Sequence, residues 1–377
     1  MIIDNIKVKN FKSLKNVDIK LNNFTLISGV NSSGKSSLIQ SLLLFKQNLE
    51  IILLEEQFRS YLGANKNIKL PIKTISFNGN YINVGDEKLI LSQESSNDDM
   101  TFTLGSTEKS TSIDINPKLE ISHSEDSDFE ILQIFSDQFF DYLNTNRTQP
   151  KHTFDYSSKD IENNSLGIHG QYTAHYLAEK RHQPLIIDAL QHPNSKTSQL
   201  LENTYKWLSE ISSNVSISAS ADASTQSVKL TYMYEYEGGT SSNYSSLNVG
   251  FGLTYVLPVI VLILKSKPGD LIIIENPESH LHPAGQSKIA ELCAIAANNG
   301  VQIIVETHSD HFLNGLRVAT KKKIITPEKS QLHYFEKPED SLETVVHSIN
   351  IDEEGRIDEW PEGFFDEWDI KLNELLW

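Results

Sequence analysis

A glycine-rich segment, GVNSSGKS at residues 29–36, has the residue types and spacing of a phosphate-binding loop. It follows the β-rich run FTLIS and precedes the run SLIQSLLLFKQ, whose apolar residues have helical spacing. A turn between a strand and a helix directs several backbone N–H groups and the positive end of the helix at one point. Lys35 can reach the β- and γ-phosphates there, and Ser36 can bind Mg²⁺. We therefore predict a site for a nucleoside triphosphate, formed by Gly29, Asn31, Ser32, Ser33, Gly34, Lys35, Ser36 and Ser37.

Two later segments end in residues that could complete this site. In LIIIENPESHLHP an apolar strand ends at Glu275, and an acid in this position holds Mg²⁺ opposite the phosphate-binding loop in such enzymes. The strand VQIIVE runs into THSDH, which leaves His308 at the carboxyl end of a strand. Ligands bind at this edge of open α/β sheets. We therefore predict Glu275 as the metal-binding acid and place His308 in the same site.

A further segment lies between the phosphate-binding loop and the strand that ends at Glu275. It reads SLNVGFGLTYVLPVIVLILK and contains a glycine turn at residues 248–252 that opens an apolar helix. This turn, the ENPE strand end and the His308 strand end make the chain resemble the ATP-binding-cassette class of ATPases. More narrowly, it resembles the ATPases related to the SMC, RecF and OLD families, many of which belong to bacterial phage-defence loci. The resemblance covers the first fifty residues and roughly residues 245–335.

The resemblance implies roles for several of these residues. Asn248, Gly250 and Gly252 would form the signature loop, which closes over the γ-phosphate of an ATP held by the other subunit. His308 would be the switch histidine that senses that phosphate. The cofactors implied are ATP and Mg²⁺, and the partner implied is a second copy of the chain.

Two further residues enter through the same resemblance. NFKSL at residues 10–14 resembles the opening of SMC-like heads, where a basic residue helps to bind phosphate, so Lys12 is a candidate. Gln93 follows KLILS and could be the glutamine that reaches Mg²⁺ and water. The alternative interpretation of Gln93 is a surface residue after a strand.

One departure from the pattern bears on the chemistry. In most transporters of this class the metal-binding acid is followed by a catalytic glutamate, but here Asn276 follows Glu275. An amide cannot accept a proton from the attacking water. Either Glu278 is the catalytic base, or turnover is slow and the protein acts as a long-lived ATP-bound clamp.

The histidines allow a competing hypothesis. His280, His282, His308 and His311 could be imagined around a zinc ion. The alternative is that HLHP forms the turn after the metal-binding strand and that His311 lies on the surface.

Composition limits the remaining functions. The net charge is −17, with seven lysines against two aspartates in residues 1–49 but fourteen acids against three bases in both 86–142 and 336–377. A mostly acidic surface repels phosphate backbones, so any nucleic-acid contact must be local and salt-sensitive. The longest apolar run, YVLPVIVLIL, is shorter than the roughly twenty residues of a membrane span. We expect the single cysteine, Cys293, in a helical core and the protein in the cytoplasm.

The predicted fold class is α/β, a P-loop NTPase of the ABC-ATPase type with an N-terminal antiparallel β-lobe and an inserted helical lobe. We expect helices at 128–146 and 170–181, and a hairpin from 211 to 239 that returns to the signature loop. We expect the N-terminal part of the head at residues 1–124 and the inserted helical lobe at 125–211. The C-terminal part of the head is expected at 212–335 and an acidic tail at 336–377.

The tail distinguishes the chain from OLD-type nucleases. Their metal-binding Toprim domain needs on the order of a hundred residues, and fewer than seventy follow His308. We therefore expect no Toprim domain. Trp360, Phe364, Phe365 and Trp368 are expected to dock the tail on the body or on a partner.

These observations predict a homodimeric ATPase whose two heads pack head to tail around two Mg·ATP. Its output would pass through a separate effector, a nuclease or a toxin, in bacterial antiphage defence. The alternatives are an ATP-gated clamp for DNA repair or recombination and a nucleotide-binding scaffold without turnover.

Overall fold

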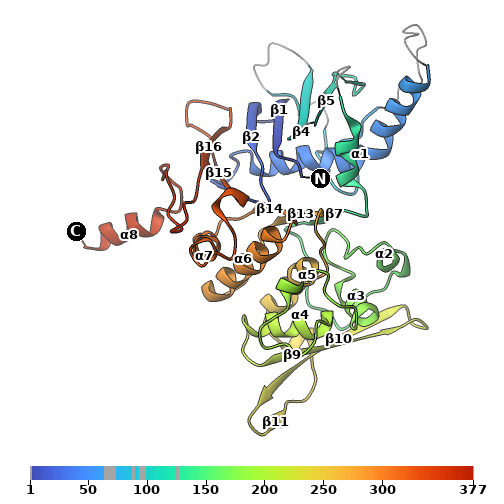
Figure 1. Ribbon diagram of the computed structural model, residues 1–377, viewed down its shortest axis with the longest axis vertical. Helices are drawn as coiled ribbons and strands as arrows, with labels where there is room; N and C mark the ends of the chain where they lie inside the picture. Colours follow the sequence, from blue (N-terminus) through green and yellow to red (C-terminus); the bar gives the residue numbers. More distant parts are fainter. Residues whose placement is uncertain are drawn as a thin grey trace.

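The computed structural model describes residues 2–62, 74–86, 90–92, 99–107, 109–123 and 127–376. Its centre is a six-stranded sheet in which five neighbouring strands are parallel and one edge strand is antiparallel (Figure 1). In spatial order the strands are β16 (Val345–Ile349), β15 (Ser330–Glu336), β3 (Phe24–Gly29), β14 (Gln302–Glu306), β13 (Leu271–Glu275) and β7 (Phe140–Leu143).

Both faces of this sheet are buried, which explains why its central strands are mostly apolar and show no regular alternation with polar residues. Along β13, Ile272 and Ile274 belong to one core and Leu271 and Ile273 to the other. The first core packs against α5 (Phe251–Leu264), α6 (Pro283–Asn298) and α7 (Asp310–Lys321), and the second against α1 (Lys35–Leu62). Cys293 is buried in α6, as expected.

A second, antiparallel sheet lies over α1 and is formed by the N-terminal part of the chain (Figure 1). Its strands in spatial order are β2 (Leu14–Lys20), β1 (Asn5–Phe11), β4 (Met100–Ser106), β5 (Lys109–Ile115) and β6 (Ile121–His123). The predicted N-terminal β-lobe is therefore confirmed. Outside these strands, isolated bridges join Asn78 to Asn83 and Phe11 to Leu91.

The segment 125–211 is not purely helical, which corrects the expected helical lobe. The predicted helix at 128–146 is wrong, because a 3-10 helix at Phe129–Phe135 is followed by β7, which pairs with β13 in the main sheet. A short apolar run fits a buried strand as well as a helix, and only the partner strand decides between them. The remaining elements are β8 (Phe154–Asp155), α2 (Ser158–Glu162), α3 (Thr173–Lys180) and α4 (Leu200–Ser209).

The predicted return hairpin is present as β9 (Val215–Asp222) and β10 (Ser227–Tyr236), which pair antiparallel. Helices α3 and α4 pack on this hairpin. Two short strands, β11 (Gly239–Thr240) and β12 (Tyr244–Ser245), also pair with β10. The hairpin therefore delivers the chain to the start of α5.

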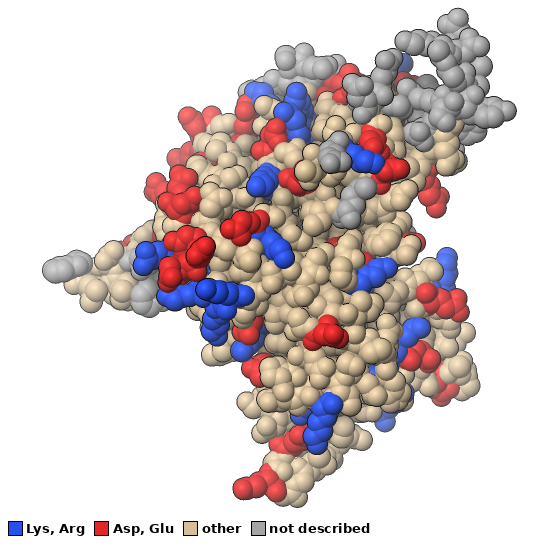
Figure 2. Space-filling view, viewed as in Figure 1, with Lys and Arg blue, Asp and Glu red and all other residues tan. Residues whose placement is uncertain are grey.

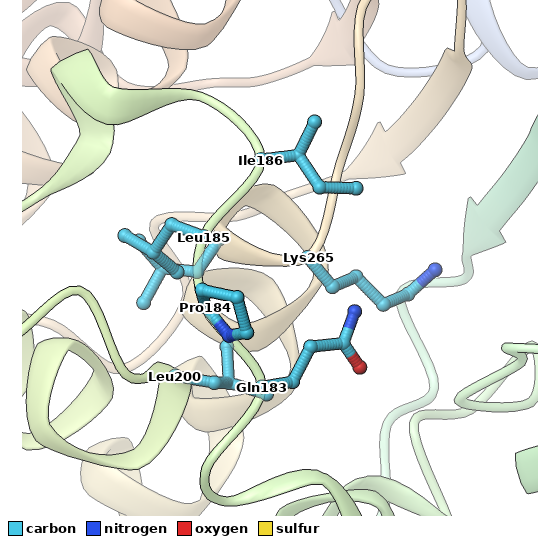
Figure 3. Close-up of a pocket in the computed structure, with 7 residues that line it drawn as sticks. Gln183, Pro184, Leu185, Ile186, Leu200 and Lys265 are labelled. Carbon is cyan, nitrogen blue, oxygen red and sulfur yellow. The ribbon is translucent and has the colours of Figure 1, made fainter.

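A narrow crevice lies where the segment 183–186 meets Leu200 and the end of α5 (Figure 3). Lys265 lies at this end of α5, and its Nζ is 2.5 Å from Oδ2 of Asp141 in β7. The crevice encloses no water-sized volume, so it is a packing gap between the inserted segment and the core helix.

The expected acidic tail, residues 336–377, contributes to the main sheet, because β16 pairs with β15. Beyond it, Phe364 is buried against Tyr334, with ring centroids 5.4 Å apart, whereas Trp360 is exposed. The tail docks on the body through Phe364 before it ends in α8 (Glu367–Leu376).

A 20-residue stretch of α1, Lys35–Leu54, is long and apolar enough by composition to cross a membrane. Half of the scored window is buried inside the protein. This stretch begins at the phosphate-binding loop and packs between the two sheets, as a core helix does.

Candidate nucleotide-binding site

The phosphate-binding loop (residues 29–36) connects β3 to α1 as predicted. Lys35 Nζ donates hydrogen bonds to the carbonyl oxygens of Gly29 (3.0 Å) and Val30 (2.7 Å). Burial lowers the pKa of Lys35, and the carboxylate of Glu306 opposes that shift. An ammonium group has three donors and no acceptor, so phosphate oxygens can replace these carbonyls as its partners.

The loop is held from outside by the C-terminal part of the chain. Thr344 Oγ1 donates to Ser33 O and also lies within hydrogen-bond distance of Ser13 Oγ, both at 2.8 Å. Gly34 has φ +105°, and a Cβ there would lie 2.3 Å from Thr344 Oγ1. The second glycine of the motif is therefore required both by its backbone conformation and by this close approach. Sequence reasoning did not find Thr344, which is distant in sequence from the loop.

Two glutamates end neighbouring strands beside the loop. Glu275 and Glu306 are partners in the parallel register of β13 and β14. Ser36 Oγ donates to Glu306 Oε1 at 3.3 Å. Burial and then the charge of Glu275 raise the pKa of Glu306 to about 7, against the opposing effect of Lys35. Glu306 was not among the residues predicted from the sequence, although it ends an apolar strand just as Glu275 does.

Glu275 is oriented by residues at the end of β7. Its Oε1 accepts from the hydroxyl of Tyr142 (2.8 Å), and its Oε2 accepts from Oγ1 (2.9 Å) and N (3.2 Å) of Thr145. Asn276 has φ +45°; its Oδ1 accepts from Thr145 Oγ1 (2.9 Å) and its N–H donates to Glu306 O (2.7 Å). The amide of Asn276 is therefore engaged with Thr145.

Glu278 lies in the same site and is buried, with 7% of its surface exposed. Its Oε1 accepts from the backbone N–H of His308 at 3.1 Å, and its Oε2 is buried without a hydrogen-bond partner among the described residues. The imidazole of His308 has a lowered pKa because of burial and the nearby charge of Lys35. The structure thus brings Glu278 and His308 together at the carboxyl end of the sheet.

The Gly250 turn (residues 248–252) lies on the surface. Leu247, just before the turn, is 48% exposed, and Phe251, within it, is 39% exposed. Asn248 Oδ1 accepts from the hydroxyl of Ser245 at 2.8 Å. A Cβ on Gly250 would meet no atom within 4 Å. Among the described residues no hydrogen bond joins this turn to the phosphate-binding loop of the same chain.

Gly252 differs from Gly250, because the fold itself requires it. A Cβ on Gly252 would lie 2.4 Å from the carbonyl oxygen of His280. The rings of Phe251 and Tyr255 lie 4.6 and 5.0 Å from the His280 ring. The first turn of α5 is therefore packed tightly on the segment that follows Glu275.

Among the described residues, Lys12 forms no hydrogen bond with this group. Lys12 Nζ donates to Gln40 Oε1 in α1, and burial lowers the pKa of Lys12. Gln93 lies outside the described residues. Both assignments remain predictions.

The zinc hypothesis gains no support. Within the described part of the chain no three His, Cys, Asp or Glu side chains are grouped so as to hold a metal ion. His282 caps α6 by accepting from Ala284 N at 3.4 Å, and His280 packs between aromatic rings. The HLHP segment is thus the turn between β13 and α6, as the alternative stated.

The site does fit Mg²⁺, which prefers hard oxygen ligands and keeps several waters. The oxygens of Ser36, Glu275 and Glu306 lie at one edge of the sheet, where burial and then the charge of Glu275 raise the pKa of Glu306. One or two carboxylates and a loop serine are sufficient, together with phosphate oxygens.

The strand order and the site define the class of protein. The strand of the phosphate-binding loop, β3, is separated from the Glu275 strand, β13, by β14, which leads to His308. With the loop between strand and helix, this is the α/β fold of a P-loop NTPase.

The chain belongs to the AAA ATPase domain family, whose model matches residues 1–313. Residues 325–375 match a second family, described as a protein of unknown function (DUF3696). No curated protein matches the chain.

Three solved structures are similar. An SMC head bound to the C-winged helix domain of ScpA has a TM-score of 0.53 at 15% identity, covering 93% of this chain and 98% of that one. An SMC head domain from Thermotoga maritima has a TM-score of 0.46 at 13% identity, covering 92% and 98%. An SMC head with an extended coiled coil, bound to the C-terminal domain of ScpA from Pyrococcus furiosus, has a TM-score of 0.47 at 13% identity, covering 99% of both chains. The first likeness supports the fold.

Proposed function

We propose that this protein binds and hydrolyses Mg·ATP at the carboxyl ends of β3, β14 and β13. The observation that carries the proposal is the convergence there of a loop lysine, a loop serine, three glutamates and a histidine. Lys35 and His308 would contact the γ-phosphate, and Ser36 and Glu275 would hold the metal. Bound Mg²⁺ would neutralise charge on the phosphate oxygens.

In this proposal Glu278 is the general base. Its Oε2 is buried and unpaired, so the folded protein holds a proton acceptor in the site that no described group satisfies. The backbone N–H of His308 fixes the other oxygen, which orients the carboxylate. Tyr142 and Thr145 orient Glu275, and Asn276 takes no proton because its amide cannot accept one.

We further propose that two copies pack head to tail, with the Gly250 turn of each copy on the γ-phosphate of its partner. A glycine is not required at position 250 by the chain's own packing, since a side chain there would meet open space. The exposed turn, with Asn248 at one end, is therefore suited to a close contact from outside. Gly252 supports the turn through its packing on His280.

Mass measurement in solution tests the dimer. With ATP and Mg²⁺ the chain should double in mass when Glu278→Gln slows hydrolysis, and Gly250→Asp should keep it monomeric. Lys35→Ala should weaken nucleotide binding and prevent the dimer. A monomer at all ATP concentrations in the Glu278→Gln variant would refute the head-to-tail arrangement.

The next part of the proposal concerns the molecule on which the ATP-dependent dimer acts. Since the site residues account for one ATPase reaction, we propose that a separately encoded effector, a nuclease or a toxin, reads the dimer in antiphage defence in the cytoplasm. The similar SMC head is bound by a domain of ScpA, which supports a protein partner by analogy. Plaque counts with wild type and Lys35→Ala test the defence role, and equal counts would refute it.

The alternative, a DNA clamp, has a local observation in its favour. Lys321, Lys322 and Lys323 are exposed at the end of α7. On the face of the molecule that Figure 2 shows, basic side chains lie in small groups among acidic ones. A contact between this face and DNA would therefore be limited in area. DNA binding at near-physiological salt that depends on a non-hydrolysable ATP analogue would favour the clamp, and its absence would favour the effector.

A further inference from the structure

Arg147 lies in the segment after β7 and is almost completely buried, with 2% of its surface exposed. Its guanidinium donates to the carbonyl oxygen of Asn276 (3.1 Å) and to that of Glu275. Within the described residues it forms no ion pair with a carboxylate, and its Nε has no hydrogen-bond partner. Burial lowers the pKa of Arg147 to about 10, which leaves the group charged at neutral pH.

The same guanidinium contacts α5. Its central carbon lies 4.7 Å from the ring centroid of Tyr255. The hydroxyl of Tyr255 donates to the carbonyl oxygen of Thr145, and the hydroxyl of Thr145 donates to Glu275 Oε2 (2.9 Å). The contacts therefore form a closed ring that runs from the end of β13 to α5 and back.

Tyr255 is linked in turn to the Gly250 turn. The ring of Phe251, one helical turn earlier, stacks on it with centroids 5.8 Å apart, and the His280 ring contacts both. Gly252 packs on the His280 carbonyl. The start of α5 thus has few ways to move without moving Arg147.

A buried cation that forms no direct ion pair is costly, even though the charges of Glu278 and Glu275 favour the protonated form of Arg147, and an apolar side chain would fill the same space without that cost. A guanidinium can hold two carbonyl oxygens and stack on a ring at the same time, because it is planar and has five donors. Packing alone therefore does not explain why a charged side chain lies behind the carbonyls of Glu275 and Asn276.

We propose that Arg147 is a positioning residue that couples the Glu275–Asn276 strand end of one nucleotide site to the Gly250 turn, which serves the site of the partner copy. The proposal rests on the head-to-tail dimer proposed above. A change in the hydrogen bonds of Glu275 reaches α5 through Arg147 and Tyr255, so the state of one site alters the turn offered to the other.

Mixed dimers with one working site test the coupling. One copy carries Gly250→Asp and keeps its phosphate-binding loop; the other carries Lys35→Ala and keeps its Gly250 turn. The working site joins the loop of the first copy to the turn of the second. Arg147→Gln is then placed in either copy, and kcat and KM for ATP are measured.

Coupling predicts a lower kcat in both placements. In the copy that supplies only the turn, we expect a loss of about 2- to 30-fold, the range of mutations that disturb coupling, with KM changed less than about twofold. A wild-type rate in that placement would overturn the proposal, because Arg147 would then serve Glu275 alone. Arg147→Lys, which keeps the charge but cannot hold both carbonyls and the ring, should recover only part of the rate.

Two controls keep the outcomes separate. Arg317→Gln removes a guanidinium that also contacts a carbonyl oxygen (Gly355, 2.8 Å) and a ring (Trp360, 5.6 Å), but far from the site, and should leave kcat unchanged. If Arg147→Gln fails to fold by circular dichroism, Tyr255→Leu in the turn-supplying copy gives the same test, with the same loss expected and a wild-type rate refuting. A mixed dimer that lacks activity before any change at Arg147 would overturn the dimer proposal and this inference with it.

Discussion

Replacement of Glu278 by glutamine is the sharpest test of the chemistry. Glutamine has nearly the same shape, and its amide oxygen can still accept from His308 N, the bond of 3.1 Å made by Oε1. The other oxygen, Oε2, has no described partner to lose. An unpaired buried polar group is present before and after the change, so we expect the free energy of unfolding to change by less than about 2 kcal/mol.

The rate should change much more than the stability. A general base contributes about 10²- to 10⁴-fold, which corresponds to about 2.7 to 5.4 kcal/mol in the activation free energy. Steady-state phosphate release should therefore fall by that factor in Glu278→Gln. Binding of a fluorescent ATP analogue should stay within about twofold, because an uncharged amide leaves the contacts of Lys35 in place.

Glu291→Gln is the matched control, since Glu291 lies in α6 and pairs with Lys288 (3.3 Å) outside the site. It should hydrolyse ATP at the wild-type rate. Unchanged hydrolysis in Glu278→Gln would refute the assignment of the base. Equal rates in wild type and Lys35→Ala would instead show that the protein is a scaffold without turnover.

Three further outcomes follow from the geometry. Gly252→Ala should destabilise the fold by about 1–3 kcal/mol, because its Cβ would lie 2.4 Å from His280 O, whereas Gly250→Ala should be nearly neutral; equal denaturant midpoints would contradict this. Folding raises the pKa of Glu306 from 4.5 to about 7, so the folded protein binds more protons than the unfolded chain between these two pH values. The free energy of unfolding of the nucleotide-free protein should therefore fall by about 3 kcal/mol as the pH rises from 4.5 to 7. Glu306→Gln should abolish that fall, and urea unfolding at pH 5 and pH 8 measures it; the same pH slope in both proteins would show that Glu306 is not its source. Lys35→Ala should weaken ATP binding by at least about tenfold in titration calorimetry, through loss of a charge-assisted contact, and unchanged affinity would place the triphosphate elsewhere.

The parts of the site that the sequence predicts are those whose function is local. The phosphate-binding loop needs only a strand, a glycine turn and a helix in succession, and all three are adjacent in the chain. Glu275 and His308 each follow a run of apolar residues that can only be a buried strand or helix. Their convergence follows because the carboxyl ends of parallel strands meet at one edge.

What the sequence did not predict depends on which distant segments pair. The run FDYL is equally compatible with a helix, and its pairing with β13 is what places Tyr142, Thr145 and Arg147 behind Glu275. Glu306 was overlooked because it becomes a neighbour of Ser36 only when β14 lies between β3 and β13. No local pattern contains this information.

The C-terminal segment shows most clearly why its place could not be read from composition. Its acidic residues suggested a separate tail at residues 336–377, yet β16 in that segment pairs with β15, which is the direct neighbour of β3. Thr344 holds the carbonyl of Ser33, so the loop is supported on one side by residues more than three hundred positions away. Among the described residues β16 pairs with β15 and with no other strand, so this edge of the sheet lies beside the support of the phosphate-binding loop.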